Sequence, residues 1–326
     1  MQDNPEQEEG RRRAASPAHI MKKHFFGKHA RKDLPLHMMM LPGVILIAIF
    51  SYGPMFGLVM AFQRFSPQKG FFHSEWVGLE NFRYVLNLPN FWQVIGNTLF
   101  ISVFKIIGSI VVPVVVTLLL NELLGIKLKR TLQTIIYFPH FLSWIILGGI
   151  LIDILSPSEG IFGSAAAALG IKPVYFLGDK NWFPITMIIS EIWKEFGYGT
   201  VVYFAALAGI DPVLYEAAQI DGAGRWKQAI HITLPGLYPT IFLMAVLALG
   251  TILNAGTNGF EQIFNLYSPQ VYETGDILDT LVYRLGLGSA QFSVATAIGL
   301  FKSLISFVLM TGGYWLVKRT SGYEVL

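Results

Sequence analysis

Six long apolar stretches constrain the fold of this chain more than any other feature of its sequence. A helix that crosses a bilayer needs about 20 mainly apolar residues, at a rise of about 1.5 Å per residue. Stretches of this kind lie at about 37–62, 94–120, 132–155, 183–208, 237–254 and 293–317. Charged residues make up only 14% of the chain, whereas a soluble domain carries about 25%. The sequence therefore predicts an all-α membrane protein with about six transmembrane helices.

The placement of Lys and Arg predicts how these spans are oriented. Cytoplasmic loops of membrane proteins carry an excess of basic residues. With the amino terminus in the cytoplasm, 15 of the 24 Lys and Arg residues lie on that side, six lie opposite and three lie within spans. We therefore expect both termini to be cytoplasmic, with a basic arm over 1–36, a transmembrane domain over 37–320 and a short tail over 321–326. The arm lacks the early apolar core of a cleavable signal peptide.

The sequence lacks several residues and motifs that disulfide formation, metal binding or ATP hydrolysis would require. The chain contains no Cys, its seven His show no metal-binding spacing, and it has no Gly-x-x-x-x-Gly-Lys-Ser/Thr phosphate loop. We therefore expect no catalytic residues, no metal site and no ATP hydrolysis by this chain. A net charge of +3 predicts no nucleic-acid partner.

The predicted cytoplasmic loop between the fourth and fifth spans, residues 211–235, has the pattern of two short helices. Asp211-Pro212 is typical of a helix start, because Asp caps free N–H groups and Pro is tolerated at the first helical position. The first helix would end at Asp221-Gly222, and a second, over 223–232, would end at Leu234-Pro235, where the chain turns back into the membrane. Such a helix–turn–helix predicts a rigid knob that docks in a groove of a partner.

The same loop carries a resemblance to a known family. Glu216-Ala217-Ala218, Asp221-Gly222-Ala223, Ile232 and Leu234-Pro235 reproduce the EAA loop of binding-protein-dependent ABC import permeases. Phe91-Trp92, Asn97-Thr98, the run from Tyr137 to Trp144, and the run from Asp179 to Trp182 resemble the carbohydrate branch, of the lipo-oligosaccharide and alginate type with a maltose-permease-like fold. The resemblance covers about residues 37–320.

The resemblance implies a non-enzymatic permease subunit in the bacterial cytoplasmic membrane. Its implied partners are a second homologous permease, two ATPase subunits that bind ATP and Mg²⁺, and a periplasmic or extracellular solute-binding protein. The cargo would be an oligosaccharide, with an acidic fragment such as alginate among the candidates, moved by alternating access. The chain itself would bind no cofactor. Glu216 would contact the ATPase or cap the loop, Ala217 and Ala218 would allow close helix approach, and Gly222 would make the bend.

Polar residues within the spans give candidates for a substrate path. Glu191, Lys194 and Glu195 lie on one face of the fourth span, at a spacing that allows them to pair with one another. With Trp193 and Tyr198 nearby, this face would either line a saccharide path or lock two helices together. Asn254 and Asn258, at the end of the fifth span, would bind sugar hydroxyls or simply end a helix. Lys105 and Lys302 would favour an acidic saccharide or extend to the membrane interface.

Two other classes of protein remain as alternatives. An ion-coupled secondary transporter would use Glu191, Glu195 or Asp153 as a proton site, but would have no need of a docking knob. An intramembrane enzyme would need converging acid, base or nucleophilic groups, and the sequence shows no such pattern.

Overall fold

The computed structural model describes residues 30–123 and 125–321, which divide into two compact units at the boundary between Gly57 and Leu58. Most of the predicted basic arm and of the predicted tail therefore lies outside the described residues. In the first unit, α3 (Ala30–Ile47) continues into a π-helical turn, η1 (Ala48–Tyr52). With η2 (Gly53–Phe62), these form an apolar helical run over Pro35–Phe62 that is long enough to cross a membrane and covers the first predicted span.

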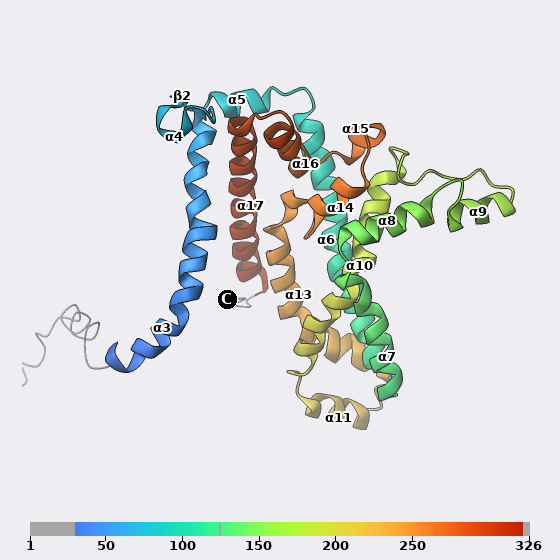
Figure 1. The fold of residues 1–326 in the computed structure, drawn as a ribbon. Coiled ribbons are helices and arrows are strands. Elements are labelled where there is room, and N and C mark those ends of the chain that lie inside the picture. Colours follow the sequence, from blue (N-terminus) through green and yellow to red (C-terminus); the bar gives the residue numbers. More distant parts are fainter. Residues whose placement is uncertain (1–29, 124, 322–326) are drawn as a thin grey trace, which may run out of the picture. The chain divides into compact units, whose positions relative to one another are not determined.

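The second unit contains the helices that make up the remaining candidate spans (Figure 1). They are α6 (Phe91–Asn121), α7 (Ile126–Tyr137), η3 (Phe138–Phe141), α8 (Trp144–Leu155), α10 (Trp182–Leu207), α11 (Pro212–Ile220), α12 (Arg225–Gln228), η4 (Ala229–Thr233), α13 (Leu234–Leu249) and α17 (Phe292–Ser321). In the described part of the chain, four helices are long and apolar enough to cross a membrane, or six if two sharply bent pairs each count as one span. The prediction of an all-α membrane protein with several spans is confirmed.

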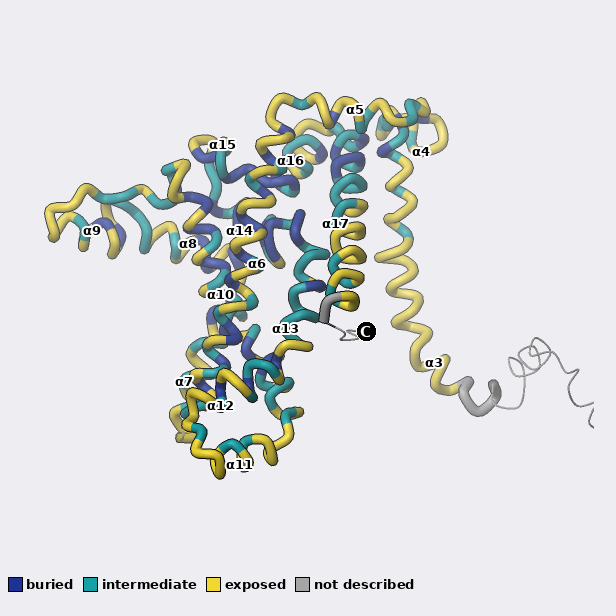
Figure 2. Tube along the Cα trace, turned by 180° about the vertical axis from the view of Figure 1, so that it is seen from behind, coloured by how far each residue is buried: buried dark blue, intermediate teal, exposed yellow. Residues whose placement is uncertain are grey.

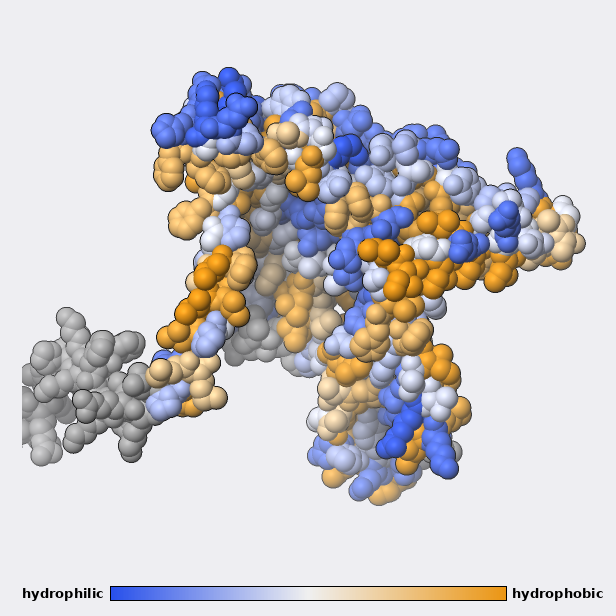
Figure 3. All heavy atoms as spheres, in the orientation of Figure 1, coloured by the Kyte–Doolittle hydropathy of each residue, from blue (hydrophilic) through white to orange (hydrophobic). Residues whose placement is uncertain are grey.

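Shorter elements lie away from α11, at the opposite end of this unit (Figure 1). They are β1 (Gln63–Arg64), α4 (Gly70–His73), β2 (Glu75–Trp76), α5 (Glu80–Leu86), η5 (Ile252–Asn254), α14 (Gly259–Leu266), η6 (Pro269–Val271), α15 (Tyr272–Gly275), α16 (Leu278–Tyr283) and η7 (Arg284–Gly288). The two strands form one antiparallel pair, with Gln63 opposite Trp76. A further helix, α9 (Ile161–Ala168), follows α8, and hydrophobic residues cover one side of both (Figure 3).

The predicted third span, 132–155, is not one straight helix. The chain bends by 101° between η3 and α8. Pro139 lies just before the bend, and Leu142 and Ser143 adopt extended conformations that end the first helix. Ser143 then caps α8 by accepting a hydrogen bond from the backbone N–H of Ile146 at 3.3 Å.

The predicted turn at Leu234-Pro235 is also wrong, because the helix passes through it. Helical structure is continuous from Arg225 to Leu249, and Leu234 has helical dihedral angles. A proline inside a helix lacks an N–H group and would clash with the preceding turn. Here the π-helical turn η4 comes directly before α13 and widens the helix at this point. The second helix of loop 211–235 and the fifth predicted span are therefore one continuous helix.

The core of the second unit is built around α6 and α10, which pack along each other. One cluster of buried side chains surrounds Trp144 and Met187, and another surrounds Phe91 and Ile298. Burial is concentrated in the middle of this unit (Figure 2). Many of its apolar side chains outside the core are exposed. An apolar periphery around a packed centre is what a helix bundle in lipid requires.

Candidate functional site

The loop 211–235 has the local structure of a helix followed by a sharp break. The carboxylate of Asp211 accepts a hydrogen bond from the backbone N–H of Val213 at 2.9 Å and so caps α11. Gly222 has a φ of +74°, a left-handed conformation that favours glycine. The N–H of Ala223 donates to the carbonyl of Ala218 at 2.8 Å, which closes the end of the helix. The sequence pattern therefore predicted the cap and the bend of this loop correctly.

A side-chain hydrogen bond joins α11 to the helix that follows it, and another closes the start of that second helix. The hydroxyls of Tyr215 and Thr233 lie 3.0 Å apart, and Gln228 donates to the carbonyl of Ala223 at 2.8 Å. Thr233 is buried and belongs to η4, directly before α13. The Tyr215–Thr233 contact therefore connects α11 to the start of the fifth predicted span.

The outer surface of the loop combines apolar and charged groups. The exposed apolar side chains include Val213, Leu214, Ile220 and Trp226, and Ile220 is 87% exposed. Glu216 is exposed too, and within the described residues its side chain forms no hydrogen bond that would cap the loop. Ala217, Asp221, Gly222, Ala223 and Ile232 lie on the same short stretch, mostly exposed or half-buried. Clustered exposed apolar side chains are typical of an interaction surface.

A buried polar node joins α6, α10 and the segment after α13. The ammonium of Lys105 lies 2.7 Å from Glu191 Oε2 and donates to the carbonyl of Ala255 at 2.9 Å. It also donates to Gln262 of α14. Gln262 in turn donates to the carbonyl of Met187 at 2.8 Å. Glu191 thus pairs with a lysine of another helix, although the spacing within α10 would also have allowed it to pair with Lys194.

A second polar node lies one turn further along α10. Lys194 donates to Glu195 at 2.7 Å and to the carbonyl of His140 at 3.0 Å. Glu195 also lies 2.7 Å from His140 Nδ1, and Asn258 donates to Glu195 at 3.3 Å. The ring of His140 stacks on Tyr198, with 4.0 Å between ring centroids. His140 was not singled out as a site residue, although it lies within the Tyr137–Trp144 motif.

Both nodes hold a non-helical segment between η5 and α14. Ala255 and Gly256 in this segment have φ angles of 54° and 98°. Lys105 binds it at Ala255 and Glu195 binds it at Asn258. A backbone with positive φ values is costly for a residue such as Ala255, so the surrounding contacts must hold it in place.

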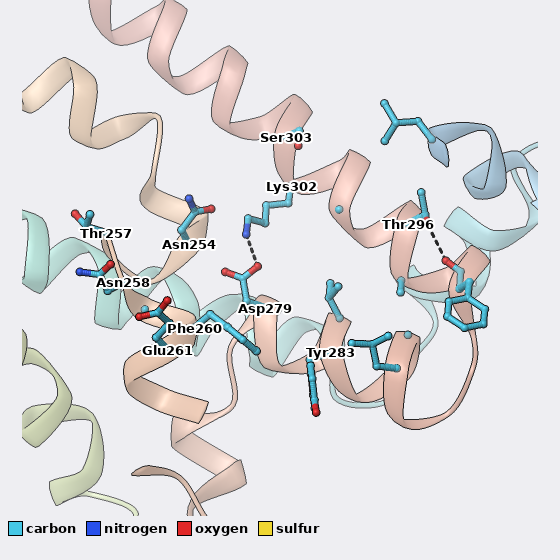
Figure 4. A pocket seen from close by; sticks show the side chains of 18 residues that line it. Asn254, Thr257, Asn258, Phe260, Glu261, Asp279, Tyr283, Thr296, Lys302 and Ser303 are labelled. Atoms are coloured by element: carbon cyan, nitrogen blue, oxygen red, sulfur yellow. Dashed lines mark hydrogen bonds and ion pairs between the residues drawn. The ribbon is translucent and has the colours of Figure 1, made fainter. Parts of the chain in front are cut away.

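Two hollows adjoin this segment, and Thr257 lines both of them. The first hollow, of about 840 Å³, is lined by Asn254, Asn258, Glu261, Asp279 and Lys302 among others (Figure 4). The second hollow, of about 370 Å³, is lined by His140, Glu191, Glu195 and Tyr198 among others.

The predicted path residues are therefore divided in space. Asn254 and Asn258 line the first hollow, whereas Glu191, Glu195 and Tyr198 line the second. Lys194 is buried at 4% exposure, and Trp193 lines a separate apolar hollow between α8 and α10.

Both lysines that were candidates for binding an acidic saccharide have carboxylate partners. Lys105 pairs with Glu191, and Lys302 pairs with Asp279 of α16 (Figure 4). Both side chains are largely buried, at 2% and 16% exposure. Their positive charges are therefore neutralised within the chain.

Comparison with known proteins adds an independent finding. Residues 114–322 match the family described as binding-protein-dependent transport system inner membrane component. The chain is 37% identical over 289 residues to Protein LplB of Bacillus subtilis, covering 89% of this chain and 90% of that protein. It is 38% identical over 284 residues to the polygalacturonan/rhamnogalacturonan transport system permease protein YteP of the same organism, covering 87% and 88%.

Two solved structures are also similar to this chain over most of its length. A chain of a bacterial ABC transporter involved in the import of the acidic polysaccharide alginate superposes with a TM-score of 0.82 at 38% identity, covering 90% of this chain and 98% of that one. A second structure, of a bacterial alginate ABC transporter in complex with an alginate pentasaccharide-bound periplasmic protein, gives a TM-score of 0.81 at 38% identity, covering 90% and 96%.

Proposed function

Since the chain belongs to the family of binding-protein-dependent transport system inner membrane components, we propose that it carries an oligosaccharide across the bacterial cytoplasmic membrane by alternating access, driven by ATPase subunits that dock on loop 211–235. As a permease component of a sugar importer it is not itself an enzyme. Family membership replaces the secondary transporter and the intramembrane enzyme as explanations. ATP and Mg²⁺ would be bound by the ATPases and not by this chain.

The observation that carries the coupling proposal is the continuity of the loop with the fifth span. Helix α11 is fastened through Tyr215 to Thr233, and the helix that contains Thr233 continues unbroken to Leu249. A partner that binds the exposed side chains of α11 would therefore move the fifth span together with the loop. Two ATPases would be served by two such loops, one from this chain and one from a homologous partner permease.

The proposed cargo is an oligosaccharide delivered by a solute-binding protein outside the membrane. The asparagines of the first hollow and the aromatic ring of Tyr198 in the second are groups that bind sugar hydroxyls and sugar faces. An acidic fragment such as alginate or a polygalacturonan is favoured by the names of the relatives.

The proposal is tested by ATP hydrolysis in proteoliposomes that contain this chain, its partner permease and the ATPases. We expect binding protein loaded with its saccharide to stimulate hydrolysis. Gly222→Val should abolish that stimulation while the complex still assembles, because a β-branched residue disfavours a φ of +74°.

Gly222→Asn is the matched control, since asparagine tolerates this conformation and an added Cβ meets nothing within 4 Å. Normal coupling by the Val variant would refute the role of the loop. Absence of any stimulation of the wild-type complex would refute the proposed function.

A further inference from the structure

The first hollow holds three charged side chains, and two of them neutralise each other. Residues at the end of the fifth predicted span and from α14, α16 and α17 line much of it (Figure 4). Asp279 of α16 and Lys302 of α17 form an ion pair across it, with side chains 22% and 16% exposed. The single lysine of the hollow is thereby occupied by a carboxylate of the same chain.

The third charged side chain, Glu261, is not part of an ion pair within the described residues. It lies in the first turn of α14, three residues after Asn258, and is exposed. Within the described residues its carboxylate has no hydrogen-bond or ion-pair partner, and it lines the hollow beside Asn258 and Phe260 (Figure 4). Glutamate carries a negative charge at neutral pH and acts only as a hydrogen-bond acceptor in that form. The hollow therefore carries one unbalanced negative charge.

The second hollow does not supply a compensating positive charge. Lys105, which lines it, is paired with Glu191, and the nearby Lys194 is paired with Glu195. His140 is held by the same Glu195 carboxylate. Among the described residues that line either hollow, every lysine therefore already has a carboxylate partner.

The remaining polar groups of the first hollow are neutral. Asn254, Asn258 and Thr257 offer amide and hydroxyl groups, and the rings of Phe260 and Tyr283 lie 5.7 Å apart. Amides hydrogen-bond hydroxyls, aromatic rings pack on the apolar faces of sugars, and a free carboxylate accepts strong charge-assisted hydrogen bonds from hydroxyls. The same carboxylate repels a carboxylate on a sugar. This combination suits an uncharged sugar and disfavours a uronate.

We propose that Glu261 is a specificity-determining residue that makes the first hollow accept the uncharged, hydroxyl-rich part of an oligosaccharide and reject uronate carboxylates. This inference rests on the proposed transport function. It assigns to this chain the recognition of sugar hydroxyls. Any carboxylates on a transported saccharide would then be met by groups outside this chain.

The test measures direct binding of two matched saccharides to the complete purified transporter, without binding protein, by titration calorimetry. The probes are trigalacturonate and its fully methyl-esterified form, which share one sugar backbone and differ in charge. We expect the ester to bind about tenfold more tightly than the acid, equivalent to about 1.4 kcal/mol. Glu261→Gln should remove most of this difference, mainly by tightening the binding of the acid, and added salt should reduce it in the wild type.

Glu159→Gln is the control, because it removes the same charge from an exposed glutamate that does not line the hollow. Its ratio of affinities should equal that of the wild type. Equal affinities of the wild type for acid and ester, an unchanged ratio in Glu261→Gln, or binding of neither saccharide would each overturn the role of Glu261. The ATPase stimulation described above decides the proposed function separately, so failure of one inference is distinguishable from failure of the other.

Discussion

Lys105 of α6 and Glu191 of α10 form an ion pair in the centre of the second unit, with 2.7 Å between Nζ and Oε2 and side chains only 2% and 7% exposed. The same ammonium binds the carbonyl of Ala255, where the backbone adopts a positive φ. One lysine thus connects the two central helices to the non-helical segment beside both hollows. The pair therefore joins α6 to α10 and holds the segment between Asn254 and Asn258 through Ala255.

Replacing Lys105 by methionine should strongly destabilise the protein. The change keeps an unbranched side chain but leaves Glu191 buried without its partner, and breaking a buried pair in this way typically costs about 3–5 kcal/mol. The double variant Lys105→Met/Glu191→Gln should recover much of the loss, because no uncompensated charge remains. Thermal unfolding of the detergent-purified protein measures both effects.

The more exposed pair between Lys302 and Asp279 provides the comparison for this experiment. Its side chains are 16% and 22% exposed, so water can solvate an orphaned carboxylate more readily. Lys302→Met should therefore cost clearly less than Lys105→Met. Equal costs for the two lysines, or a double variant no better than Lys105→Met alone, would show that the buried pair does not act as a unit.

Features encoded by neighbouring residues were predictable from the sequence. The cap at Asp211, the glycine bend at Gly222 and the existence of the apolar spans depend on a few adjacent side chains or on composition. Whether the helix bends or continues at a proline was not predictable from the sequence. At Pro139 the chain bends by 101°, whereas at Pro235 a π-helical turn lets the helix continue. The rule that proline ends a helix does not distinguish these two outcomes.

Pairings between distant residues could not be predicted at all. Lys105 and Glu191 lie 86 positions apart, whereas Lys194 lies only one turn from Glu191, so local spacing favoured the wrong partner. Similarly, Asn258 reaches Glu195 only because the chain after α13 folds back onto α10. The residue types of the candidate path were therefore evident from the sequence, but their division between two hollows depends on tertiary packing.

The approach of α10 to α7 gives a second prediction. At Gly197 an added Cβ would overlap the backbone carbonyl of Ile136, and a backbone atom cannot move aside as a flexible side chain can. Gly197→Ala should therefore separate the two helices and lower the yield of folded protein, with a cost of about 1–3 kcal/mol. Size-exclusion chromatography and thermal unfolding measure the loss.

Gly96→Ala tests whether any such loss is specific to the helix contact. Gly96 lies in α6, and an added Cβ there meets nothing within 4 Å. Because alanine is the better helix former by about 1 kcal/mol, this variant should be neutral or slightly stabilised. A Gly197→Ala protein as stable as wild type would contradict the close approach of α10 and α7.

The final prediction concerns the hydrogen bond between Tyr215 and Thr233, whose hydroxyl oxygens lie 3.0 Å apart. Tyr215→Phe removes this link while keeping the ring, so α11 should remain folded and still bind the ATPases. If the link transmits movement from α11 to the fifth span, stimulation of ATP hydrolysis by loaded binding protein should fall severalfold, although ATPase subunits co-purify in normal amounts. Tyr238→Phe, at an exposed tyrosine within α13 itself, should leave stimulation unchanged. Loss of co-purification in Tyr215→Phe would instead mean that the hydroxyl stabilises the docking surface, and full stimulation would mean that the continuous helix transmits the movement without it.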